Sequence, residues 1–143
     1  MKNSICILLT LSLSVSLFAN TITAVTSEAS PGDWTDGASW AGGAVPQSGD
    51  IVMIPAGKAI LISDQVYSLV SPPFISLRVW GTLNFEPSGK LHLSLLSDIQ
   101  IFLGGKIKPK NSSSSQLITI GGVTKYNASN NGTIQGPAIA NAL

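Results

Sequence analysis

Few residues in this sequence have side chains that could carry out catalysis. His92 is the only histidine, so no pair of histidines is available to hold a transition metal. It stands between Leu91 and Leu93, and strand alternation predicts that it faces solvent on the side opposite these neighbours. A Ser-His-Asp triad would have to use His92, and no nucleophile-elbow motif accompanies it. We therefore predict no catalytic residue.

Three aspartates are the candidates for a metal site. Asp33 and Asp36 lie three residues apart in a turn that contains Pro31 and Gly32, and Asp50 follows nearby. A Ca²⁺ ion prefers several oxygen ligands, so these three carboxylates form the one cofactor site that we consider. The alternative is that each aspartate accepts hydrogen bonds in its own turn.

An enzyme that acts on polysaccharides would need acidic and basic groups together. Paired carboxylates can hydrolyse a glycan, and a lyase on a β-helix needs both charges on one sheet. Arg78, Glu86 and Lys90 are scattered along the sequence. The sequence therefore favours a protein without catalytic activity.

Aromatic residues provide one possible binding surface. Trp34, Trp40 and Trp80 could stack on sugar rings, because an aromatic face is apolar and sugars present C–H faces. The alternative is that Trp34 and Trp40 plug one end of the core and that Trp80 packs at a corner of the fold. Both interpretations remain open at this stage.

A cluster of lysines provides a second possible binding surface. Lys106, Lys108 and Lys110 alternate with apolar residues or proline, so their charges can point the same way and attract an anionic polysaccharide. The alternative is an ordinary solvated loop, because these lysines precede a serine-rich stretch over 112–115. We predict a basic and then serine-rich loop here.

The composition limits the classes of protein to consider. A chain of 143 residues suggests one domain. It is 44% hydrophobic and only 10% charged, with a formal net charge of +1. Such a balance argues against a nucleic-acid binder, which normally shows a basic patch. We therefore expect no nucleic acid among the partners.

The N-terminus resembles a secretion signal. Lys2 is followed by an uncharged run over 5–18, which is the length of a signal-peptide core and short for a membrane span. We predict cleavage after Ala19, which removes Cys6 and leaves a protein without cysteine or membrane span. A membrane anchor or a buried strand is the alternative. The prediction is a secreted or cell-surface protein.

The rest of the sequence predicts short β-strands. Apolar residues alternate in pieces of three to five residues, each ended by a turn signal, and no window carries a capped helical stripe. Helix should therefore be scarce. The alternating positions are Ile75, Leu77 and Val79; Leu83 and Phe85; Leu91, Leu93 and Leu95; and Ile99, Ile101 and Leu103.

An internal repeat indicates how these strands are arranged. Residues 77–85 resemble residues 99–107 at an offset of 22 to 24, with glycine at corresponding turns. A repeat of this length suits one coil of an all-β, right-handed parallel β-helix-like solenoid. Glycine at the corners would allow a positive φ. The alternative fold is an antiparallel β-sandwich.

The predicted domain covers 20–143 and divides into three parts. We expect an N-terminal cap and entry over 30–50, coils over 51–122, and a C-terminal strand and tail over 123–143. A strand is predicted over 117–120 and a last short strand over 133–136.

A motif near the N-terminus resembles a known family. The block Trp40-Ala41-Gly42-Gly43-Ala44-Val45-Pro46, followed by Gly49-Asp50-Ile51-Val52-Met53-Ile54-Pro55-Ala56-Gly57, is similar to the opening of the eight-glycine domain. The same opening is similar to that of exported surface proteins of the Bacteroidetes type. The resemblance extends over about 34–136. The doubled glycines at 104–105 and 121–122 and the loop over 106–115 depart from the family pattern.

The resemblance implies a parallel β-helix-like fold on extracellular or cell-surface proteins, and contact with polysaccharide. Some family members take part in hyaluronan binding or turnover, but the family supplies no agreed catalytic residues. We therefore expect a non-catalytic module for adhesion or polysaccharide contact, with a polysaccharide or a surface protein as partner. The alternatives are a polysaccharide lyase or hydrolase and a purely structural capping module.

Overall fold

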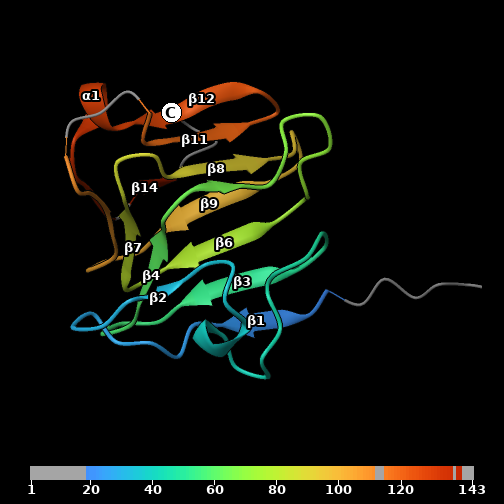
Figure 1. Ribbon diagram of the computed structural model, residues 1–143, viewed down its shortest axis with the longest axis vertical. Helices are drawn as coiled ribbons and strands as arrows, with labels where there is room; N and C mark the ends of the chain where they lie inside the picture. Colours follow the sequence, from blue (N-terminus) through green and yellow to red (C-terminus); the bar gives the residue numbers. More distant parts are fainter. Residues whose placement is uncertain (1–18, 112–114, 137, 140–143) are drawn as a thin grey trace, which may run out of the picture.

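The computed structural model describes residues 19–111, 115–136 and 138–139 (Figure 1). Residues 1–18 of the predicted signal peptide lie outside this part. The only helices within it are the 3-10 helix η1 (Gly37–Ser39) and α1 (Ala128–Asn131), so the predicted scarcity of helix is confirmed. The strands are β1 (Thr21–Thr23), β2 (Gly32–Asp33), β3 (Ile51–Ile54), β4 (Ala59–Ile62), β5 (Gln65–Val66), β6 (Ser76–Val79), β7 (Thr82–Phe85), β8 (Lys90–Leu93), β9 (Asp98–Ile101), β10 (Lys106–Pro109), β11 (Leu117–Ile120), β12 (Val123–Asn127), β13 (Ile134–Gln135) and β14 (Ala138–Ile139).

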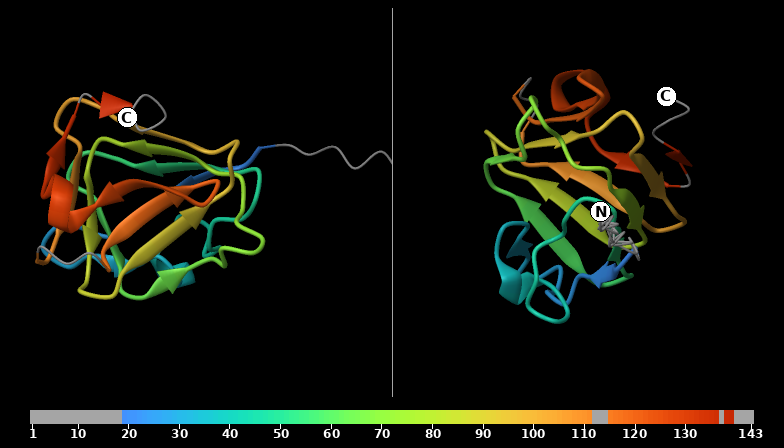
Figure 2. Two further views of the ribbon diagram at one scale, coloured as in Figure 1. Left: turned by 90° about the horizontal axis from the view of Figure 1, so that it is seen from above. Right: turned by 90° about the vertical axis from the view of Figure 1, so that its right-hand side faces the viewer.

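The strands form three sheets that wrap around one core (Figure 2). The first sheet has the order β1-β3-β6-β9-β14, the second β2-β4-β7-β10-β13, and the third β5-β8-β11-β12. Three successive coils, β3-β4-β5, β6-β7-β8 and β9-β10-β11, each add one strand to every sheet. All pairs between these coils are parallel. The predicted β-solenoid is confirmed, and the β-sandwich alternative is wrong.

The pairing register explains the internal repeat in the sequence. Leu77 pairs with Ile99 in the first sheet, an offset of 22, and Leu83 pairs with Ile107 in the second, an offset of 24. The offset grows because two residues join β6 to β7, whereas four residues join β9 to β10. The repeat is therefore one full coil.

Aliphatic columns fill the centre of the solenoid. The side chains that point inward from equivalent positions of the three coils are buried, and each column continues from coil to coil. Two leucines of the alternating pattern, Leu95 and Leu103, are instead exposed, because their strands end at Leu93 and Ile101. The main columns are Val52, Leu77 and Ile99; Ile54, Val79 and Ile101; Ile60, Leu83 and Ile107; and Val66, Leu91 and Ile118.

Glycines at the first corner allow the coils to approach each other closely. A Cβ at Gly105 would collide with the carbonyl oxygen of Val79, and one at Gly81 would collide with those of Pro55 and Lys58. Neither glycine has a positive φ, so the expected need for that conformation is wrong at these two positions. Both positions need glycine because the backbone of the preceding coil fills the space of a side chain.

We predict that Gly105→Ala destabilises the protein strongly. The new methyl group meets backbone, which cannot move aside as a side chain would, so we expect a loss of at least about 3 kcal/mol of unfolding free energy. The control is Gly122→Ala, where open space surrounds the Cβ but φ is +78°. This control should lose about 1 kcal/mol. Urea denaturation compares the two, and an equal loss would contradict the explanation.

Two tryptophans close the N-terminal end of the core. Trp34 is 0% exposed and Trp40 is 2% exposed, and their rings meet edge to face with centroids 5.1 Å apart. The Trp40 Nε1–H donates to the Trp34 carbonyl oxygen at 2.9 Å. The Trp34 Nε1–H donates to the Tyr67 hydroxyl at 3.0 Å, which donates to the Pro46 carbonyl oxygen at 2.7 Å. This end of the core is therefore closed by a hydrogen-bonded aromatic plug.

We predict that Tyr67→Phe weakens this plug. The substitution leaves the Trp34 Nε1–H without its acceptor, so unfolding free energy should fall by about 1–3 kcal/mol at neutral pH.

The same variant tests the pH dependence of stability. Burial raises the pKa of Tyr67 to about 12, whereas an unfolded tyrosine has a pKa of about 10. As pH rises from about 10 to about 12, the unfolded state loses this proton first, so the wild-type protein loses stability. Tyr67→Phe should show a smaller alkaline loss in urea denaturation. An unchanged slope would contradict the assignment.

The C-terminal end is covered by a coil that runs backwards. After β11 the chain reverses at Gly121 and Gly122, and β12, β13 and β14 pair antiparallel with β11, β10 and β9. The strand predicted over 117–120 is confirmed as β11. The predicted last strand over 133–136 contains β13, but β14 follows it. Parallel stacking therefore ends at the third coil.

Candidate functional site

The three lysines singled out in the sequence lie on a strand and its end. Lys106 and Lys108 belong to β10 and Lys110 follows it directly, so the prediction of a loop starting at Lys106 is wrong. Ile107 is buried in the core, which directs Lys106 and Lys108 to the outer face of the second sheet. The alternation noticed in the sequence therefore does place these charges on one side.

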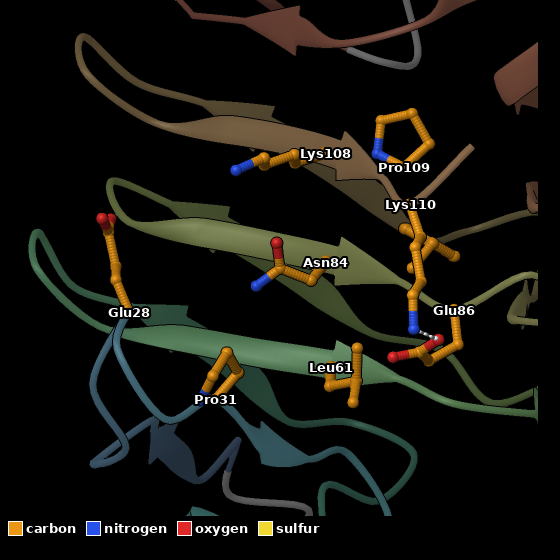
Figure 3. A pocket seen from close by; sticks show the side chains of 9 residues that line it. Glu28, Pro31, Leu61, Asn84, Glu86, Lys108, Pro109 and Lys110 are labelled. Atoms are coloured by element: carbon orange, nitrogen blue, oxygen red, sulfur yellow. Dashed lines mark hydrogen bonds and ion pairs between the residues drawn. The ribbon is translucent and has the colours of Figure 1, made fainter. Parts of the chain in front are cut away.

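A groove of about 410 Å³ lies on this outer face, beside a smaller hollow of about 100 Å³. Figure 3 shows residues from the three coil strands of the sheet along it, with Glu28 and Pro31 contributed by the segment before β2. The two hollows share Glu28, Asn84 and Lys108. The groove is also lined by Pro31, Leu61, Phe85, Glu86, Pro109 and Lys110, and the smaller hollow by Thr82 and Lys106.

The parallel register assembles the floor of the groove. Leu61 pairs with Asn84, and Asn84 pairs with Lys108, so these outward positions form a column across the coils. Adjacent members of such a column are about 4.8 Å apart. Sequence reasoning missed Asn84 and Glu28. The coil offset of 24 could have placed Asn84 beside Lys108, but nothing in the sequence indicated Glu28.

The charges in the groove are only partly paired. Lys110 Nζ lies 2.7 Å from Glu86 Oε2, in an ion pair at one end. Glu28 lies at the other end (Figure 3). Its Oε1 accepts a hydrogen bond from the Thr82 hydroxyl at 3.0 Å. Within the described part of the chain, the side chains of Lys106 and Lys108 form no hydrogen bond or ion pair. Two ammonium groups therefore remain available to an anionic ligand.

Two of the three tryptophans considered as a separate sugar-binding surface are buried. Trp34 and Trp40 are core residues whose rings cannot reach a ligand, so the prediction that they bind sugar is wrong. Trp80 is partly exposed at the corner between the first and second sheets. Phe102 covers one face of its indole, with centroids 4.1 Å apart and planes 5° apart. The two rings therefore stack at the same corner of two successive coils.

The three aspartates remain in separate turns. Asp33 accepts from the Thr35 N–H at 2.8 Å and from the Ser63 hydroxyl, Asp36 from the Ala38 N–H at 2.9 Å, and Asp50 from the Gln47 N–H at 2.6 Å. In the described residues, no group of three or more potential ligands from His, Cys, Asp and Glu lies together. The predicted shared calcium site is therefore not assembled.

The carboxyl group of Asp33 shows the effect of these bonds. Burial raises its pKa, but the hydrogen bonds from Ser63 and Thr35 stabilise the charged form, and the net effect lowers the pKa below its ordinary value. The charged Asp33 carboxylate therefore accepts hydrogen bonds that join its turn to Ser63, directly after β4.

His92 does not face solvent as predicted. Its side chain is buried, with the residue 3% exposed, and its Nδ1 lies 2.8 Å from the Thr119 hydroxyl of the next coil. Burial, and secondly the charge of Lys90, lower the pKa of His92 below its ordinary value. The histidine is thus a neutral partner that joins β8 to β11 in the third sheet.

Comparison with known proteins identifies the family of the chain. Among the described residues, no helix has the length and apolar character needed to cross a bilayer. No curated protein and no solved structure matches the chain. Residues 39–136, from the end of η1 to the last corner glycine, match the family model of the G8 domain, and the chain therefore belongs to the G8 domain family.

Proposed function

We propose that this protein is a secreted or cell-surface module that binds acidic polysaccharide, without catalysis, on the outer face of its second sheet. Membership in the G8 domain family and the β-solenoid fold fit an extracellular module. The observation that carries the proposal is the pair of unpartnered lysines, Lys106 and Lys108, on a rigid strand beside the groove. Such a module would attach its bearer to a polysaccharide matrix.

The spacing of polar groups suits a sugar chain with acidic substituents. Lys106 and Lys108 are two residues apart on one face of a strand, so their Cα atoms lie about 7 Å apart. Their ammonium groups can donate to a carboxylate or sulfate. The Asn84 amide can donate to and accept from sugar hydroxyl groups, and Glu28 can accept from them. The β-sheet holds these residues in place, which limits the entropy lost on binding.

An enzymatic function is the second candidate, because the groove brings together acidic and basic residues that are scattered in the sequence. Glu28 and Glu86 line it together with the lysines. Both carboxylates already have partners, Thr82 and Lys110 respectively. A binding function is therefore better supported than hydrolysis or elimination. A purely structural, end-stacking module is also less well supported, because β12, β13 and β14 cover the last coil.

We predict that Lys106→Ala/Lys108→Ala weakens binding to acidic polysaccharides at least about tenfold, since each charge-assisted hydrogen bond contributes about 1.5–3 kcal/mol. The measurement is calorimetric titration of the exported protein with uronic-acid and sulfated polysaccharides, with a neutral glucan as reference. Wild-type affinity should fall as salt rises.

Lys90→Ala is the matched control, because Lys90 lies on β8 in the third sheet, away from the groove. It should bind like the wild-type protein. The proposal fails if no acidic polysaccharide binds, or if Lys90→Ala loses as much affinity as the double variant. Chromatography of the titrated samples would reveal shortened chains if the protein were an enzyme.

We also predict that the exported protein begins at Asn20, because the uncharged run over 5–18 precedes Ala19. Mass spectrometry of the protein released by secreting cells gives the N-terminus directly. An intact N-terminus at Met1 in the exported protein would contradict cleavage.

A further inference from the structure

Exposed apolar side chains gather along one edge of the solenoid, where the third sheet passes to the first. We name this the apolar edge and define it as residues 67–75, 94–97 and 121–124. These three segments contain no charged residue. Val70 is 94% exposed, Leu95 76% and Leu96 78%. Leu69, Phe74 and Val123 are also exposed.

Hydrogen bonds stack the three segments on one another. The Ser94 N–H donates to the Pro73 carbonyl oxygen at 2.9 Å, and the Gly121 N–H donates at 2.9 Å to the carbonyl oxygen of Leu93, the residue directly before the second segment. The loops that lead into β6 and β9 lie on the right of Figure 1, and the right-hand view of Figure 2 looks at this side. A hollow of about 210 Å³ lies beside the edge at the last coil and is lined by Leu95, Ser97, Ile120, Val123 and Lys125.

The turn over 94–97 shows that this exposure is built into the fold. The Ser97 N–H donates to the Ser94 carbonyl oxygen at 3.0 Å, which leaves Leu95 and Leu96 at the tip. Turn tips usually carry glycine, asparagine or aspartate, which tolerate water. Two adjacent exposed leucines are costly in water, so their presence indicates contact with an apolar partner.

The chain enters the fold at the same edge. Asn20 precedes β1, and its carbonyl oxygen accepts from the Ile51 N–H at 2.8 Å, one coil below the apolar edge. In the sequence, the uncharged run over 5–18 comes before this entry point. A segment of that composition inserts readily into a bilayer. Before the predicted cleavage after Ala19, such a segment would hold the protein at a bilayer through Asn20, on the same side as the apolar edge.

We propose that the apolar edge rests on a lipid bilayer, with its leucine and valine side chains in the interface. These tips project from the surface, and fluid lipid accommodates such tips without the complementary shape that a folded protein partner would need. The three segments that define the edge carry no charge, so binding should not require anionic lipid. Each coil runs from the first sheet to the second and then the third, so the edge lies across from the second sheet. The lysine groove then faces away from the membrane.

Vesicle sedimentation with the exported protein and phosphatidylcholine vesicles tests this proposal. The salt concentration is about 1 M, where charge interactions are screened beyond about 3 Å. We expect the wild-type protein to sediment with the vesicles. Leu95→Ser/Leu96→Ser should lower the partition coefficient at least about tenfold, because two exposed leucines lose their apolar area. Circular dichroism verifies that both leucine variants are folded.

Leu103→Ser is the matched control, because Leu103 is 84% exposed at the corner between the first and second sheets, away from the apolar edge. All variants share one N-terminus, so any remaining leader contributes equally. The proposal is overturned if the wild-type protein does not sediment, or if Leu103→Ser loses as much binding as the double variant. Lys106→Ala/Lys108→Ala should sediment like wild type, so this outcome is independent of polysaccharide binding.

Discussion

The close parallel stacking of coils is the constraint on which the rest of the structure depends. Backbone hydrogen bonds hold successive coils about 4.8 Å apart, and at that distance no Cβ fits at Gly81 or Gly105. The same spacing brings inward residues into continuous aliphatic columns and outward residues into surface columns. The same strand register therefore forms both the core and the groove, and a shift of a strand at the corner would disturb both.

The architecture could be predicted from the sequence because its signals are local and repeated. The alternation of apolar residues predicted the strands, and the repeat at an offset of 22 to 24 residues predicted the coil. The failures lie where a strand ends or reverses. Leu95 and Leu103 continue the alternating pattern but lie in turns, because the corner hydrogen bonds end the strands two residues earlier. The antiparallel return of β12 to β14 has no repeat to reveal it, since its residues do not copy those of the coils.

The candidate site was harder to predict than the fold. The lysine alternation was visible, yet the proline at 109 and the serines beyond it favoured a loop. Trp34 and Trp40 were ambiguous because a buried tryptophan and a binding tryptophan look the same in a sequence. His92 was misplaced because alternation gives the face of a sheet but not what covers that face. Glu28 comes from a separate segment, so only the folded chain shows that it reaches the groove.

The reversed last coil has a consequence for the length of the protein. An antiparallel strand offers a different hydrogen-bond pattern from a parallel one, so a further parallel coil cannot simply follow β12. New coils, which here repeat at offsets of 22 to 27 residues, could be inserted only between existing parallel coils. Each insertion would lengthen the second sheet by about 4.8 Å and leave the aromatic plug and the reversed coil unchanged. The solenoid could therefore be lengthened between two unchanged ends, and the outer face of its second sheet would lengthen with it.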